Sequence, residues 1–118
     1  MTDKELLELA AKAAGYPRTK WDEHGWFYVC GLEGEWLGPS DFELWNPLTD
    51  DGDALRLAVK LGLFIQINSG SATAWKWRGE NWYEQASDNA DDMSATTRRA
   101  IVRAAAEIGR DMTWHTNK

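Results

Sequence analysis

The chain has 118 residues, 43% of them hydrophobic, with a formal net charge of −6 and a single cysteine, Cys30. This length fits one domain with one core, and no run of about 18 apolar residues predicts a transmembrane helix. A lone cysteine excludes a disulfide framework and a thiol-rich metal site, so we expect a reducing cytosol. The acidic N-terminus is not typical of a secretory signal.

The first predicted element is a helix. Thr2, followed three residues later by Glu5, has the form of a capping box, and Gly15 is placed to end the helix. Apolar residues at helical spacing predict its buried stripe. This stripe consists of Leu6, Leu9, Ala10 and Ala13.

Residues 18–46 are predicted to form β structure with tight turns. The segment 26–30 is a strong strand candidate because aromatic and β-branched residues follow one another. Alternation gives this strand one face with Trp26, Tyr28 and Cys30 and another with Phe27 and Val29. A further short strand is predicted at 42–45.

The sharpest local signal begins a central helix. Asn46-Pro47 predicts a turn, because proline moves the preceding residue out of the helical region. Asp50 or Asp51 then caps the first helical turn instead of binding calcium, since the bidentate glutamate of a calcium loop is missing. Gly62 is placed as a left-handed stop. The buried stripe is predicted to be Ala54, Leu57, Ala58 and Leu61.

Three strands and a helix are predicted after this point. The strands cover 63–67, 72–78 and 82–86, with turn residues between them. The last helix is predicted to begin at its cap, Ser94, with Arg103 and Glu107 as an exposed ion pair. Its buried stripe is predicted to be Ile101, Ala105, Ile108 and Met112.

The element order α-β-β-α-β-β-β-α predicts one α+β domain over residues 1–118. We expect an antiparallel sheet of about four to five strands, with the helices packed on one face. The helix and strand stripes predict one shared core. Its members are predicted to include Leu57, Leu61, Ile65, Ile101, Ala105 and Ile108.

Three segments carry a resemblance. Residues 5–10, 45–55 and 97–106 contribute an opening helix, an Asn-Pro turn before a central helix, and an Arg-Ala-rich final helix. In these segments the chain resembles small uncharacterised proteins of tailed phages and prophages and, more loosely, the NinX-like phage family. The resemblance implies a phage accessory protein in the cytoplasm of a bacterial host. That family has no catalytic assignment, so it implies no active-site residues.

The sequence shows no pattern of an enzyme. Phosphate-binding glycine motifs are absent, and the glycines at 31, 34 and 38 lie among acids that would repel phosphate. The run Asp22-Glu23-His24 is more typical of a surface turn than of a metal site. Cys30, in the middle of an apolar strand, is expected to be buried and inert. We therefore expect no catalytic, cofactor or metal site.

The distribution of charge predicts a partner-binding region. No lysine or arginine lies between Lys20 and Arg56, whereas the chain becomes basic from Ser94 onward. The chain also has eight tryptophans, more than one small core uses, and Trp36 lies within the acidic interval. The predicted partner-binding residues are Asp22, Glu23, Glu33, Glu35, Trp36, Asp41 and Glu43. The alternative is that Arg78, Arg98 and Arg99 neutralise these acids in the fold.

The charge pattern favours a protein that binds a basic surface, and the resemblance implies that it is a non-enzymatic phage protein that binds and inhibits a host protein, such as an anti-CRISPR-like factor. Two alternatives remain open: a nucleotide-binding or nucleotide-sequestering protein that stacks aromatic residues on a base, and a structural phage protein. Direct nucleic-acid binding is not expected, because the acidic body would repel phosphates. The sequence predicts no oligomeric state.

Overall fold

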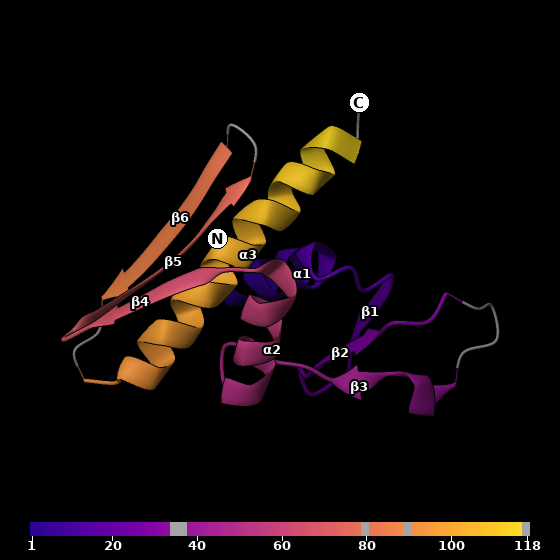
Figure 1. Cartoon of the computed structure of the whole chain (residues 1–118). Helices are drawn as coiled ribbons and strands as arrows, with labels where there is room; N and C mark the ends of the chain where they lie inside the picture. Colours follow the sequence, from indigo (N-terminus) through magenta and orange to yellow (C-terminus); the bar gives the residue numbers. More distant parts are fainter. Residues whose placement is uncertain (34–37, 79–80, 89–90, 117–118) are drawn as a thin grey trace.

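Figure 1 shows the computed structural model of the chain, which describes residues 1–33, 38–78, 81–88 and 91–116. The described residues form three α-helices, a short 3-10 helix and two antiparallel sheets of three strands each. In chain order the elements are α1 (Asp3–Ala13), β1 (Arg18–Trp21), β2 (Phe27–Cys30), η1 (Pro39–Asp41), β3 (Glu43–Leu44), α2 (Asp51–Leu61), β4 (Phe64–Asn68), β5 (Ser71–Arg78), β6 (Asn81–Asp88) and α3 (Met93–Thr116).

The α+β class is confirmed, but the prediction of one sheet is wrong. Strands β1-β2-β3 form a small sheet and β4-β5-β6 form a large sheet. The division follows from the chain between them: β3 is only two residues long, and the Asn46-Pro47 turn and α2 then lead the chain away. Figure 1 shows the two sheets on opposite sides of the molecule, with α2 between them.

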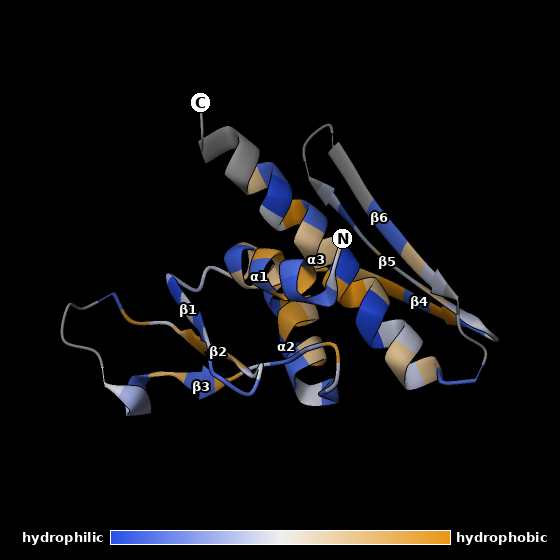
Figure 2. Ribbon diagram, turned by 180° about the vertical axis from the view of Figure 1, so that it is seen from behind, coloured by the Kyte–Doolittle hydropathy of each residue, from blue (hydrophilic) through white to orange (hydrophobic). Residues whose placement is uncertain are grey.

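Helix α3 lies at the centre of the packing. It contacts α1 along one side and the strands β5 and β6 along another, with α2 nearby (Figure 1). Ala72 and Ala74 of β5 are fully buried beneath it. Figure 2 shows hydrophobic residues along α2 and β4 and, between hydrophilic ones, along α3. Because α3 has neighbours on several sides, it buries more than the single stripe that was predicted.

The predicted core is largely confirmed. Leu57, Leu61, Ile101, Ala105 and Ile108 are buried, while Ile65 and Met112 are partly buried against the same cluster. In α1 the stripe differs by one position: Leu7 and Ala11 are buried together with Leu6 and Ala10, whereas Leu9 and Ala13 are only partly buried. Helix α1 packs closely against α3, and this contact buries two adjacent rows of α1 side chains instead of one.

The helix ends follow local chemistry. The Thr2 hydroxyl accepts the N–H of Glu5 at 3.1 Å, and the Asp50 carboxylate accepts that of Asp53 at 2.8 Å, so both predicted caps are confirmed. Gly62 ends α2 with a left-handed φ of 68°, as predicted. The predicted cap of the last helix is wrong.

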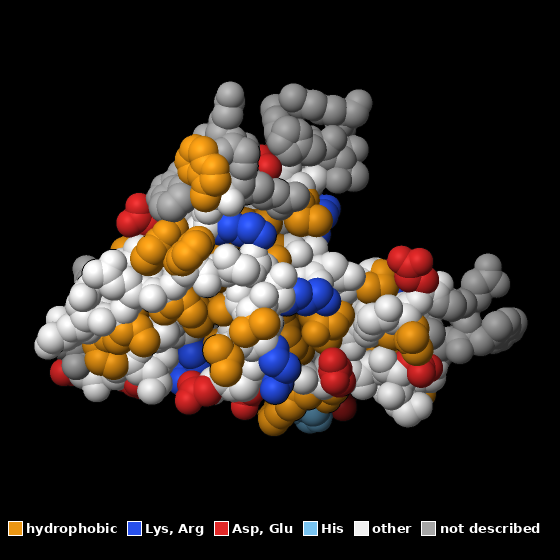
Figure 3. Space-filling view, in the orientation of Figure 1, with side chains coloured by type: hydrophobic (Ala, Val, Ile, Leu, Met, Phe, Trp, Pro, Cys, Tyr) orange, Lys and Arg blue, Asp and Glu red, His pale blue; other side chains and the backbone are white. Residues whose placement is uncertain are grey.

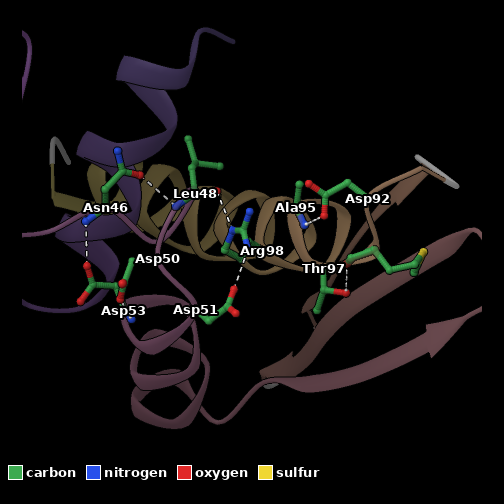
Figure 4. Close-up of polar contacts among 10 residues, drawn as sticks. Asn46, Leu48, Asp50, Asp51, Asp53, Asp92, Ala95, Thr97 and Arg98 are labelled. Atoms are coloured by element: carbon green, nitrogen blue, oxygen red, sulfur yellow. Dashed lines mark hydrogen bonds and ion pairs between the residues drawn. The ribbon is translucent and has the colours of Figure 1, made fainter.

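Asp92, not Ser94, caps α3. Its carboxylate accepts the N–H of Ala95 at 3.0 Å, and the helix begins at Met93 (Figure 4). Asp92 lies one position before the helix, where its carboxylate also suits the positive end of the helix dipole. Ser94 therefore lies inside the first turn, where a side chain does not cap the helix.

Candidate protein-binding surface

The small sheet buries one face and leaves the other open. Its register pairs Lys20 with Tyr28 and Tyr28 with Leu44, so these three side chains share one face. The opposite face of β2 carries Phe27 and Val29, which are buried in the core. The predicted alternation of this strand is therefore confirmed for positions 27 to 29, whereas Cys30, which was predicted on the same face as Tyr28, is buried. Figure 1 shows the small sheet projecting from the helices, away from the large sheet.

The open face is apolar at its centre. The side chains of Trp26 and Leu44 are 53% and 47% exposed. Trp26 comes directly before β2, and the Asp22 carboxylate holds both its N–H and the Tyr28 hydroxyl. Lys20 places its Nζ atom 4.3 Å from the ring centroid of Phe42 and 5.7 Å from that of Tyr28. We call these five residues, Lys20, Trp26, Tyr28, Phe42 and Leu44, the outer face.

Asp22 fixes the turn that leads into this face. Its Oδ1 atom accepts the N–H groups of His24 and Trp26, each at 2.9 Å, and the Tyr28 hydroxyl donates to its Oδ2 atom at 3.3 Å. The bond from the Trp26 N–H, followed by the other donors, lowers the pKa of Asp22 below its ordinary value. Desolvation, with the nearby Asp22 charge, raises the pKa of Tyr28. Asp22 thus holds Trp26 and Tyr28 in place as an anion.

The predicted partner-binding acids are divided among three places. Asp22 and Glu23 lie together in the β1–β2 turn, whereas Glu33 follows the other end of β2, roughly 13 Å away by the rise of a four-residue strand. The Asp41 carboxylate accepts the N–H of Gly38 at 2.8 Å, at the start of the 3-10 helix, and so helps to hold that short helix in place. Glu35 and Trp36 lie outside the described residues.

Glu43 points away from the outer face. It lies opposite Val29 in the register and therefore shares the face that turns toward the core. Burial raises the pKa of the Tyr16 hydroxyl there, and the charge of Glu43 adds to the rise. The hydrogen bond to Asp53 raises the pKa of Arg56, and the charge of Glu43 adds a smaller part of that rise. It therefore belongs to the border between the small sheet and α2.

The basic residues of α3 do not neutralise these acids. Arg98 Nη1 lies 2.6 Å from the Asp51 carboxylate, and its Nε–H donates to the Leu48 carbonyl at 2.8 Å (Figure 4). Arg99 pairs with Asp3 at 3.0 Å. The side chain of Arg78 lies outside the described residues. The described residues 18–44 hold five carboxylates against two cations, so this part of the molecule keeps a negative balance.

Sequence reasoning missed Trp26 and Leu44 as candidate contact residues. The alternation that separates Trp26 from the buried Phe27 was visible in the sequence. Asp22, four residues earlier, is a residue type that often accepts backbone N–H groups in a turn, and here it accepts that of Trp26. The pairing of Leu44 with Tyr28 was not visible, because it depends on a strand of two residues.

Among the described residues, no cluster of three His, Cys, Asp or Glu side chains could hold a metal ion. Cys30 is buried, and its sulfur accepts the N–H of Leu32 at 3.3 Å. No described helix is both long and apolar enough to cross a membrane. Comparison of the chain with protein families, with curated proteins and with solved structures finds no match.

Proposed function

We propose that the protein acts without catalysis, by binding a bacterial host protein through the outer face of the small sheet. The observation that carries this proposal is the exposure of Trp26 and Leu44 on a sheet whose other face is buried. Tryptophan is enriched among residues that dominate binding energy, and apolar residues surrounded by charge are typical of interface centres. Asp22 positions Trp26 before any partner arrives, which reduces the entropy lost on binding.

The charge of the region defines the partner. Five carboxylates against two cations favour a protein with a basic surface, and Glu23 and Glu33 are the exposed acids at the two ends of the hairpin. The resemblance to phage proteins supports a host protein as the partner and the host cytoplasm as the location. In this proposal the protein inhibits its partner by covering that basic surface, as an anti-defence factor would.

The test is affinity capture from lysate of a bacterial host, with identification of the captured protein by mass spectrometry. We expect one protein whose capture falls at least tenfold for Trp26→Ala and for Glu23→Lys with Glu33→Lys, and weakens as salt rises. Trp77→Ala is the matched control, because Trp77 is 58% exposed on the large sheet. Equal loss of capture in the Trp26 and Trp77 variants, or capture that salt does not weaken, would contradict the proposal.

A further inference from the structure

An apolar groove lies on the other side of the molecule, beneath the first strand of the large sheet. Its volume is about 460 Å³, and its apolar walls come from three elements: Leu55 on α2, Ile65 and Ile67 on β4, and Met93 and Ile101 on α3. Figure 3 shows hydrophobic side chains gathered over the region of β4 and α2 on this face. The groove belongs neither to the small sheet nor to the proposed host contact.

The strand above this groove has a free edge. β4 pairs with β5 alone among the described strands, so the hydrogen-bonding groups along its other side have no strand partner. The segment 64–68 contains no charged residue and no proline. Edge strands of monomeric proteins are usually protected by a lysine, a proline or a bulge. β4 has no lysine or proline, and its pairing with β5 is regular, so this edge is open to pairing with another strand.

We propose that β4 pairs with β4 of a second copy, in antiparallel orientation about Gln66, to join two large sheets into one of six strands. This register places Ile65 opposite Ile67 of the second copy and Gln66 opposite Gln66. Such an arrangement is closed and isologous, so each contact occurs twice. The inward-facing isoleucines of each copy would then lie over the groove of the other.

The charged residues near the edge of β4 are paired within the chain, so they favour neither a basic nor an acidic partner. The groove rim carries Asp51 and Arg98, which neutralise one another, and Arg56 is paired with Asp53 at 2.7 Å. A strand whose two isoleucines are symmetric about a central glutamine is complementary to itself and brings no like charges together. These features favour a second copy over a basic or acidic protein.

The exposed area is sufficient for a weak dimer. Leu55 and Val59 of α2 and Phe64 and Ile67 of β4 each expose more than half of their surface. Together these side chains offer on the order of 200–300 Å² of apolar surface. With the strand backbone and the groove walls, the contact approaches the roughly 600 Å² per partner of weak complexes. We therefore expect association at micromolar concentrations.

The first experiment is sedimentation velocity of the full chain between about 5 and 500 μM. We expect a monomer–dimer equilibrium that Ile67→Lys shifts at least tenfold toward monomer, because the two lysines would face one another's strands. Trp77→Lys, on the outward side of β5, is the matched control and should leave the equilibrium unchanged. Added salt should strengthen the dimer by screening the net charge of −6 on each chain. This dependence is opposite to that of the proposed host contact, so the two proposals fail separately.

The register is tested by cross-linking. Residues directly opposite in an antiparallel pair have Cα atoms within the range that a disulfide spans. Gln66→Cys should therefore form a covalent dimer under mild oxidation, whereas Asn68→Cys, which faces Phe64 of the second copy, should not. A chain that stays monomeric at 500 μM, a dimer that Ile67→Lys leaves intact, or equal cross-linking of both cysteine variants would overturn the proposal.

Discussion

The contact between α1 and α3 provides a sharp test of the packing, through Gly109→Ala. A Cβ atom at Gly109 would lie 2.0 Å from the carbonyl oxygen of Leu9 and 2.8 Å from its carbonyl carbon. Both atoms belong to the backbone of α1, so no side chain can rotate away. The two helices would have to separate by about 1 Å, which would loosen the alanine contacts along their length.

Two opposing effects determine how much Gly109→Ala changes the unfolding free energy. Alanine in a helix interior is favoured over glycine by about 1 kcal/mol, whereas overpacking of a close contact costs typically 1–3 kcal/mol and occasionally more. Because the clash is with backbone, we place the cost at the upper end and expect a net loss of about 2 kcal/mol in unfolding free energy. For a domain of this size the loss corresponds to roughly 8 °C in melting temperature.

The measurement is equilibrium unfolding in urea, with the slope compared between variants to check that only stability has changed. Gly52→Ala is the matched control, because the three atoms nearest to a Cβ atom there, at 3.2 Å, belong to the side chains of Arg56 and the cap residue Asp50, and none of them is a backbone atom. We expect that variant to be unchanged or stabilised by up to about 1 kcal/mol. If Gly109→Ala were as stable as Gly52→Ala, the close approach of α1 and α3 would be refuted.

Three further predictions concern the core, a cap and a turn. Leu57→Ala should lower the unfolding free energy by about 2–5 kcal/mol, because the side chain is buried; a loss below about 0.5 kcal/mol in urea unfolding would show that the helix face is wrong. Asp50→Ala should cost about 0.5–2 kcal/mol in thermal unfolding, and millimolar calcium that stabilised only the wild type would contradict the cap assignment. The pKa of Asp22 is lower in the folded state than its ordinary value of 3.8. The Asp22 carboxylate therefore contributes its full share of the unfolding free energy above pH 3.8, and this share is lost as pH falls through the folded-state pKa. The stability advantage of the wild type over Asp22→Asn should therefore shrink below about pH 4, and a difference that stayed constant from pH 6 to pH 2.5 would refute the role of the charge.

Local features could be predicted from the sequence because their causes are local. The limits of α2 depend on Asp50 at one end and Gly62 at the other, and both residues act within one turn. The buried stripe of α2 follows from spacing alone. The cap of α3 shows the limit of this approach: Asp92 and Ser94 are both good caps, and only the path of the loop chooses between them.

Features that depend on distant residues could not be predicted. The division into two sheets depends on strand pairing, and the pairing of Arg98 with Asp51 joins positions 47 residues apart. The predicted Arg103–Glu107 pair is wrong for the same reason. Arg103 donates to the Ala86 carbonyl of β6 at 3.0 Å, and Glu107 pairs with Arg110. A partner on another strand therefore outcompetes the helical neighbour.

The candidate surface was predicted in part. Acids at 22 and 23 were named from the absence of nearby cations, and the structure places them beside Trp26. The sequence could not show that Asp22 and Asp41 hold backbone groups, or that Glu43 faces the core side of β3. Whether a carboxylate is available to a partner depends on its local hydrogen bonds, which composition does not reveal.

The most direct test of the central claim is photo-cross-linking in host cells. A benzophenone amino acid would replace His24, in the turn beside Trp26, in one variant and Trp77 in another, because both side chains are exposed and neither is assigned to the contact itself. We expect a covalent adduct with one host protein from position 24 and none from position 77. An adduct from position 77 alone, or the same adducts from both positions, would contradict the claim that the outer face of the small sheet binds the host partner.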